Sequence, residues 1–471
     1  MVERHPIREV WAQAWPSVLT MVSYTSMQFV GALMVAQVGP VEIAAQGSGG
    51  IWSFVPLAFL FGVLVMVNTF TAQNLGAGRR NETARFAWTG LWFSLAVWIV
   101  VMLPWAFFLP YFFKQLGHSE LLCAQETKYA VTLVLGSLIA LAGKCMSNFF
   151  FGLQRPRVIA LAAIVGNIVN LFLSYALIFG QNGLPSMGLP GIPGLPALGI
   201  LGAAIATLCG TCAELSLPLS IFFSAQFAKD HGVWESWRPS LVDLKKLVRV
   251  GWPVSIQFGN EIVCWAIFMT LLVGRFGEIH LSAGWATLRY MNLSFMPAVG
   301  FSVAATALVG KYIGAGRPDL AANRAHWGVL MAAMYMTVCG VVMAIFREPL
   351  ISLFATSSNA QDAEKILRIG SHFMICAAVF QTFDAVGIVY TGALRGAGDT
   401  VVPGLYTIAF SWIFIVLGGW IFAVEWPGLE SLGPWIASAF YIIVLGAFMA
   451  KRFEGGRWKQ IRLLETNPIH G

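Results

Sequence analysis

Five ionisable residues stand inside long apolar segments of the sequence, where charge is costly. They are Lys144, Glu214, Glu261, Arg289 and Asp384. On insertion scales an ionisable side chain at the middle of a membrane costs about 2.5 to 3.5 kcal/mol, so each one is a functional hypothesis by default. These residue types bind and release protons or pair with charged ligands. The chemistry that they suggest is therefore ion binding inside a membrane.

Glu261 and Asp384 are the two acids that lie deepest within their segments. If they face one cavity, their charges repel and are poorly solvated, which makes protonation of the pair switchable. A proton, a sodium ion or a cationic substrate could each neutralise the pair. The alternative is structural, in which one acid pairs with Arg289 or Lys144 to hold helices together. A Lys144–Glu214 ion pair is likewise expected, because buried charges are usually paired.

The composition requires a bilayer around the whole chain. Of 471 residues, 58% are hydrophobic and 11% are charged, whereas soluble domains are about half apolar and about a quarter charged. The mean hydropathy of +0.73 extends along the full length. The sequence predicts an all-α integral membrane protein.

Twelve segments are long and apolar enough to span a membrane, which takes about 20 residues each. Lys and Arg are concentrated in the loops at one face, which places both termini in the cytoplasm. The expected spans are 11–37, 50–73, 86–111, 128–151, 157–180, 198–225, 246–275, 284–310, 325–347, 366–393, 402–424 and 432–450.

Several other classes of protein are disfavoured. The net charge of +7 is spread over short loops and does not form a basic soluble face, so no nucleic-acid partner is expected. The seven cysteines are an odd number in mostly apolar segments, which predicts no disulfide framework. No metal-ligand cluster and no nucleophile with a base appears, so we expect neither an enzyme nor a bound metal or cofactor.

An internal repeat links residues 14–85 to residues 251–324. Trp15-Pro16 recurs as Trp252-Pro253, and Gly76-Ala77-Gly78-Arg79 recurs as 314–317. Two halves of six helices follow, related by an axis along the membrane normal, and two such lobes can rock around a central cavity, as alternating access requires. The repeat predicts an N-lobe over 1–225, a cytoplasmic linker over 226–245, a C-lobe over 246–452 and a basic cytoplasmic tail over 453–471. Duplicated bundles also occur in channels.

In order and spacing, these segments resemble the MATE (multidrug and toxic compound extrusion) transporters over nearly the whole chain. The resemblance is carried by MQFVGALMVAQVG at 27–39, NIVNLFLSYALIFG at 167–180, PAVGFSVAATALVGKYIGAGR at 297–317 and YTGALRGAGDT at 390–400. It implies twelve helices in two six-helix lobes, a V-shaped fold, and efflux of varied, often cationic, organic compounds in exchange for protons or sodium.

The resemblance also implies roles for particular residues. Glu261 and Asp384 match the acids of the family's C-lobe cation site. Asn170, Ser174 and Thr207 stand at or beside positions of its N-lobe polar site, but Gly31 replaces the Asp that many bacterial members carry in the first helix. The repeat places Tyr24 at the position of Glu261, so we expect coupling to be centred on the C-lobe. Tyr24, Arg289, Trp265 and Met269 are the candidates to line the substrate cavity.

We therefore expect a monomeric antiporter in a bacterial-type inner membrane that exports small organic molecules in exchange for H⁺, or less readily Na⁺. Phe380, one helical turn before Asp384, stands where some sodium-coupled members carry a Tyr hydroxyl, which favours protons. One alternative is a lipid-linked oligosaccharide flippase, which would need a more cationic cavity. Another is a passive channel, which could not build a substrate gradient.

Overall fold

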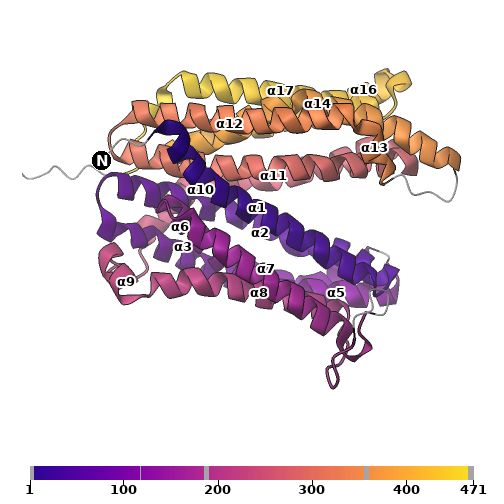
Figure 1. The fold of residues 1–471 in the computed structure, drawn as a ribbon, viewed down its shortest axis with the longest axis horizontal. Coiled ribbons are helices and arrows are strands. Elements are labelled where there is room, and N and C mark those ends of the chain that lie inside the picture. The colour runs from indigo at the N-terminus through magenta and orange to yellow at the C-terminus, as the bar shows by residue number, and fades with distance from the viewer. Residues whose placement is uncertain (1–4, 117, 185–189, 355–359, 465–471) are drawn as a thin grey trace, which may run out of the picture. The chain divides into compact units, whose positions relative to one another are not determined.

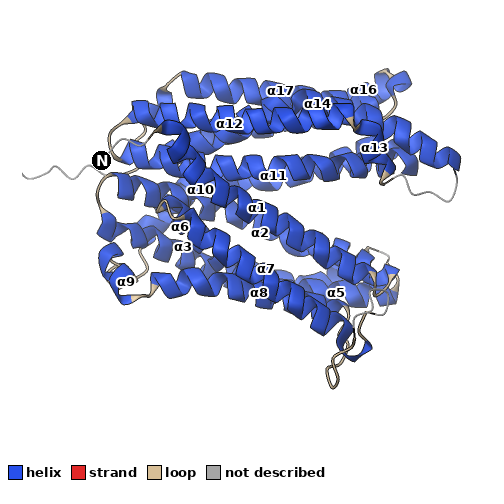
Figure 2. Cartoon of the chain, in the orientation of Figure 1, coloured by secondary structure: helices blue, strands red, loops and turns tan. Residues whose placement is uncertain are grey.

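The structure, a computed structural model, describes residues 5–464 apart from 117, 185–189 and 355–359. All regular elements in this part of the chain are helices (Figure 2). The chain forms two compact units: unit 1 contains residues 1–18 and 256–471, and unit 2 contains residues 19–255. The lobe boundaries expected at 225 and 246 stay a prediction, and residues 465–471 of the expected tail lie outside the described residues.

Two helices contribute to both units, and the other described helices belong to one unit each. The shared helices are α1 (Pro6–Ala36) and α10 (Leu241–Ile267). Unit 2 also contains α2 (Pro40–Gly76), η1 (Arg80–Glu82), α3 (Thr83–Val97), η2 (Trp98–Met102), α4 (Leu103–Gln115), α5 (Glu120–Leu135), α6 (Ser137–Gly152), α7 (Pro156–Phe179), η3 (Gly180–Asn182), α8 (Ile200–Phe222) and α9 (Ala225–His231).

Unit 1 is completed by the helices that follow α10. They are η5 (Phe268–Val273), η6 (Gly274–Phe276), α11 (Glu278–Gly314), α12 (Pro318–Ile345), α13 (Arg347–Ser352), α14 (Ala360–Ala397), α15 (Val401–Phe410), η7 (Ser411–Gly418), α16 (Gly419–Glu425), η8 (Pro427–Leu429), α17 (Leu432–Glu454) and η9 (Arg457–Gln460). The long helix α14 packs against α11, α12 and α17 (Figure 1).

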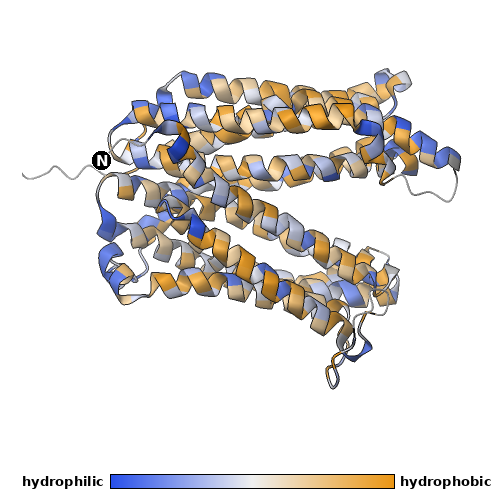
Figure 3. Ribbon diagram, in the orientation of Figure 1, coloured by the Kyte–Doolittle hydropathy of each residue, from blue (hydrophilic) through white to orange (hydrophobic). Residues whose placement is uncertain are grey.

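In the described part of the chain, eleven helical segments are long and apolar enough to cross a membrane, and the number is 12 if the bent pair of α5 and α6 forms one span. The two helices of this pair meet at Gly136 with a bend of 46°. Within the helices the residues are mostly apolar, and hydrophilic residues gather toward the helix ends (Figure 3). The predicted all-α, multi-pass membrane architecture is therefore confirmed.

Local sequence signals account for where several spans begin. Proline occupies the first turn of α2, α7 and α12, where its missing N–H would have no helical partner and its fixed φ suits the helix. Ser119 caps α5 by accepting a hydrogen bond from the Leu122 N–H at 3.3 Å. Three spans also contain π-helical stretches, η2, η5 and η7, a geometry that is frequent at functional sites.

Both shared helices pass from one unit to the other just after a proline. Residues up to Val18 of α1 belong to unit 1, and residues up to Ser255 of α10 belong to unit 2. Pro16 and Pro253 each lie two residues before these borders, inside their helices. A proline within a helix removes one backbone hydrogen bond and favours a kink. The first helix of each sequence half therefore begins in the unit that is formed mainly by the other half. It enters its own unit shortly after the proline of the repeated Trp-Pro pair.

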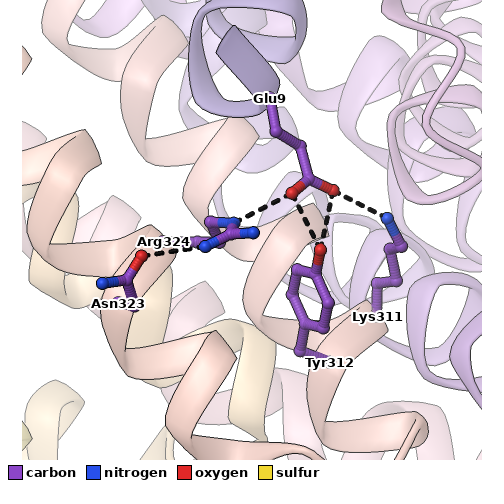
Figure 4. A network of polar contacts seen from close by, with 5 residues as sticks. All are labelled: Glu9, Lys311, Tyr312, Asn323 and Arg324. Atoms are coloured by element: carbon purple, nitrogen blue, oxygen red, sulfur yellow. Dashed lines mark hydrogen bonds and ion pairs between the residues drawn. The ribbon is translucent and has the colours of Figure 1, made fainter. Parts of the chain in front are cut away.

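Glu9, near the start of α1, is the centre of a buried polar network in unit 1 (Figure 4). Its carboxylate accepts hydrogen bonds from Lys311 Nζ at 2.8 Å and from Arg324 Nε at 2.9 Å. The Tyr312 hydroxyl lies 2.8 and 2.9 Å from the two carboxylate oxygens. Charge-assisted bonds of this kind are the strong ones, so the network ties the start of α1 to α11 and α12.

Unit 2 contains a smaller counterpart at the start of α10. The Asp243 carboxylate pairs with Arg85 Nε at 2.6 Å, which ties α10 to α3. Asp243 is buried, whereas the Arg85 side chain is 45% exposed. In each half, an acid at the beginning of the first helix therefore binds an arginine from the third span of the other half.

Replacing Glu9 tests how much its network stabilises the protein. Glu9→Gln removes the charge and leaves Lys311 and the buried Arg324 without their counter-ion, which typically costs about 3 to 5 kcal/mol for a buried pair. We expect a clearly lower apparent melting temperature for the purified protein in detergent.

Asp243→Asn is the matched control for Glu9→Gln. Its partner Arg85 is already partly exposed and can turn to solvent, so we expect a loss near the 0 to 1 kcal/mol that is typical of exposed pairs. Equal melting temperatures for both variants would contradict the prediction that the Glu9 network stabilises the protein more than the Asp243–Arg85 pair does.

Candidate functional site

The predicted acid Glu261 lies on a polar stripe of α10. Gln257, Asn260, Glu261 and Cys264 follow one another at helical spacing, so they share one face of the helix. This face packs against α15 and η7 within unit 1. Gln257 Nε2 donates to Thr407 Oγ1 at 3.3 Å. The stripe therefore places Glu261 beside polar rather than purely apolar neighbours.

Asn260 makes the tightest contacts across this helix pair. Its Nδ2 donates to Ser411 Oγ at 2.8 Å, and its Oδ1 accepts from Trp412 Nε1 at 2.8 Å. Ser411 and Trp412 open the π-helical stretch η7. A π-helical turn rotates the following side chains relative to an α-helix, and here its start is fixed by Asn260.

Glu261 and Asp384 lie within electrostatic range of each other in the structure. Both side chains are partly buried, and their carboxylates are near enough to repel one another. Gln257 also donates a hydrogen bond to the Glu261 carboxylate. The sequence predicted this pairing of acids, and the geometry places both in spans of unit 1.

Arg395 is the cation that faces Glu261. It is 9% exposed, and its guanidinium lies 5.4 Å from the centroid of the Phe258 ring. Asp384 and Arg395 are eleven residues apart on α14, which is about three turns at 3.6 residues per turn and brings both to the same side of the helix. Glu261 thus interacts with an acid and a base presented by one helix face.

Two features of this cluster were not predicted from the sequence. Arg395 lies two residues beyond the end of the expected span 366–393, but α14 continues to Ala397, so Arg395 is helical and buried. Tyr441 of α17 is 4% exposed and lies within electrostatic range of both Glu261 and Asp384. The eleven-residue spacing on one helix was the signal that could have identified Arg395.

The predicted cavity residues occupy different environments. Met269 is 1% exposed and belongs to a hydrophobic core cluster. Trp265 is partly buried and packs edge to face on Phe268, with ring centroids 5.3 Å apart. Arg289 is exposed, with its guanidinium 5.6 Å from the centroid of the Phe354 ring. Their contact with a substrate stays a prediction.

In unit 2, Asn170 and Ser174 are both buried on α7, one turn apart. Thr207 donates to the Ala203 carbonyl of its own helix at 2.9 Å. Gly31 has open space around the position that a Cβ would take. The predicted N-lobe polar site is therefore placed on α7 and α8, and its binding role stays a prediction.

Tyr24 contacts an acid. Its hydroxyl donates a hydrogen bond to Glu214 Oε1 on α8, and Lys144 of α6 attracts the same carboxylate electrostatically. Lys144 and Glu214 are thus within electrostatic range in unit 2, and the expected ion pair between them stays a prediction. Among the described residues, no group of three or more His, Cys, Asp or Glu side chains is arranged to hold a metal ion.

The fold and these intramembrane charges define a multi-pass membrane protein with an ionisable interior. The sequence model of the MatE family matches residues 16–176 and 260–421, and the chain belongs to this family. The resemblance to the multidrug and toxic compound extrusion transporters is therefore confirmed.

The chain is similar along almost its whole length to curated proteins of this kind. It is 27% identical to the "Probable multidrug resistance protein NorM" of Mesorhizobium japonicum, over 96% of this chain and 94% of the relative. It is 26% identical to the "Multidrug resistance protein MdtK" of Yersinia pestis, over 96% and 95%.

Solved structures share the fold. A structure described as a MOP superfamily transporter from Pyrococcus furiosus superposes with a TM-score of 0.85 at 19% identity and covers 97% of this chain and 98% of its own. A crystal structure described as MATE in the bent conformation gives a TM-score of 0.82 at 19% identity, over 96% of each chain.

The role of Asn260 can be tested by its removal. Asn260→Leu leaves the Trp412 N–H and the Ser411 hydroxyl without this partner, so we expect a loss of about 1 to 3 kcal/mol in unfolding free energy. The measurement is thermal unfolding of the purified protein.

Thr270→Val is the matched control, because Thr270 lies on the same span and donates a hydrogen bond to the Ala266 carbonyl of its own helix at 2.6 Å. We expect this polar-to-apolar change to stay within about 0.5 kcal/mol of wild type. Unfolding temperatures of Asn260→Leu and Thr270→Val that both equal the wild-type value would contradict the predicted stabilising role of Asn260.

Proposed function

We propose that this chain is a secondary active antiporter that exports small organic cations in exchange for protons. The observation that carries the proposal is the cluster of Glu261, Asp384 and Arg395 inside the spans of unit 1. The names of the curated relatives describe multidrug resistance, which supports small organic compounds as the substrate class. The excess of basic residues in the loops supports cytoplasmic termini in a bacterial-type inner membrane.

The charges of the cluster explain why it would bind a cation. Two ionised carboxylates and one guanidinium leave a net charge of minus one in a poorly solvated interior. A single proton neutralises that excess charge, and so does a cationic substrate. Since the low local dielectric makes an uncompensated charge costly, the cluster favours one cation at a time.

This mutual exclusion couples the two fluxes. A proton that enters from outside displaces a bound organic cation, and a substrate that binds from the cytoplasm displaces the proton. Arg395 keeps the site from binding two cations at once, because it already compensates one carboxylate. A shared proton on two neighbouring acids is an established way for such a pair to titrate.

Protons suit the cluster better than sodium. The residue one turn before Asp384 is Phe380, which is fully buried in the apolar core and offers no oxygen ligand. The Arg395 guanidinium lies within electrostatic range of Glu261, and an arginine near the acid competes with a metal ion. No cofactor has a part in this mechanism, and a single chain suffices for it.

Transport into inverted membrane vesicles tests the proposal. The fluorescent cation ethidium is supplied outside, and a pH gradient or a sodium gradient is imposed separately. We expect wild type to accumulate ethidium under the pH gradient alone, and Glu261→Gln and Asp384→Asn to fall to the level of vesicles without the protein. Each variant removes one of the charges that the proton neutralises.

Glu425→Gln is the matched control, because Glu425 is an exposed acid at the end of α16 in the same unit. It should transport as wild type does. Equal downhill uptake in all variants, indifferent to both gradients, would indicate a passive channel and overturn the proposal. Accumulation driven by sodium alone would overturn the choice of proton.

A further inference from the structure

Glu214 is a second carboxylate inside the membrane, in unit 2. It lies on the span Ile200–Phe222, eight residues before the end of the helix. That distance is about 12 Å at 1.5 Å per residue, well within the apolar core. The site described in unit 1 does not use this residue, although an acid at this depth is costly to retain.

Side chains from two other helices converge on Glu214. The Tyr24 hydroxyl of α1 donates a hydrogen bond to Oε1. Tyr24 also hydrogen-bonds Ser147 of α6. Lys144, one turn before Ser147 on α6, supplies the opposite charge, and its ammonium lies 5.5 Å from the centroid of the Phe61 ring. These contacts form a polar cluster of hydroxyl, carboxylate and ammonium groups.

A further helix, α7, approaches α8 closely beside Glu214. A Cβ at Gly166 would lie 2.8 Å from the Glu214 Cβ, so only a glycine allows α7 and α8 to approach this closely here. Beside Glu214 lies a cavity of about 10 Å³, lined also by Ser147 and Gly143. That volume is about the minimum that one water molecule needs, so there is room for one water molecule beside the Glu214 residue.

The internal repeat relates this cluster to the site in unit 1. Tyr24 occupies the position that corresponds to Glu261, counted from the repeated Trp-Pro pairs. Unit 1 has a carboxylate at this position, whereas unit 2 has a hydroxyl that binds a carboxylate from another helix. In unit 1 the acid lies on the first helix of its sequence half, whereas in unit 2 it lies on the last, α8. Both units therefore have a carboxylate at or beside this position of the repeat.

We propose that Glu214 is a second proton-binding carboxylate of the transport cycle, held by Tyr24 and counterbalanced by Lys144. The inference rests on the proposed proton antiport. It differs from a structural ion pair, which would stay ionised throughout the cycle. When Glu214 takes a proton, the Lys144 charge is no longer balanced and unit 2 gains one positive charge. That charge disfavours an organic cation nearby, so proton binding here assists release of the substrate.

Proton release on substrate binding tests this inference directly. Ethidium is added to the purified full-length protein in weakly buffered detergent solution, and a pH-indicator dye reports the protons set free. The variants are Glu214→Gln, Glu261→Gln and the control Glu120→Gln, an exposed acid in the first turn of α5. We expect Glu214→Gln to release up to about one proton fewer per protein than wild type and Glu120→Gln at the most favourable pH.

The outcomes separate the two proposals. Release by Glu214→Gln equal to that of wild type, with ethidium still bound, overturns the role of Glu214 and leaves the proton antiport intact. Absence of release from wild type overturns the proton antiport itself. A deficit in Glu261→Gln that adds to the deficit in Glu214→Gln supports two separate sites.

Tyr24→Phe keeps the test decisive if Glu214→Gln does not fold. The ring and the carboxylate remain, but the hydroxyl that favours the ionised carboxylate is lost. We expect the midpoint of the pH dependence of proton release to rise by about half to one pH unit, as expected for loss of one hydrogen bond. A midpoint unchanged from wild type would show that the cluster is only structural.

Discussion

The mutual repulsion of Glu261 and Asp384 in a poorly hydrated interior is the interaction on which the account depends. Neither acid can be ionised at low cost there unless something compensates it. In the proposed mechanism, Arg395 compensates one charge, and a mobile cation meets the second. The cluster would then keep an affinity for protons and organic cations that a fully paired site would lack, and a coupled transporter can exploit this residual charge.

The surrounding helices fix this cluster in place. Asp384 and Arg395 lie on one face of α14, whose neighbours α11, α12 and α17 enclose it. Gln257 and Asn260 hold α10 against α15 and η7 through side-chain hydrogen bonds. The Glu9 network ties the first part of α1 to the same unit. Buried polar contacts, rather than apolar packing alone, thus set the register of the helices that carry the charges, as lipid offers no hydrophobic gain for helix association.

Much of this architecture could be predicted from the sequence because a bilayer imposes simple rules. Apolar length identified the spans, and the cost of intramembrane charge identified Glu261, Asp384 and Glu214. Arg395 could not be predicted as a buried helical residue, because composition does not distinguish a loop residue from one in the last turn of a helix. In the structure α14 continues to Ala397. Met269 lies in a hydrophobic core cluster, and its expected contact with a substrate stays a prediction, because an apolar helical stripe does not distinguish a core face from a cavity face. The hydrogen bond between Tyr24 and Glu214 joins residues far apart in the sequence, so it required the three-dimensional structure.

Infrared difference spectroscopy of the purified protein, titrated from acid to alkaline pH, tests the shared proton most directly. The account predicts a protonated-carboxyl band that wild type loses on titration, one component of which is absent in Glu261→Gln and altered or absent in Asp384→Asn, while the component of Glu214 remains in both variants. The change in either single variant follows because the two acids titrate as a pair. A band that titrates identically in wild type and in both variants would contradict the account, because the pair would then carry no exchangeable proton.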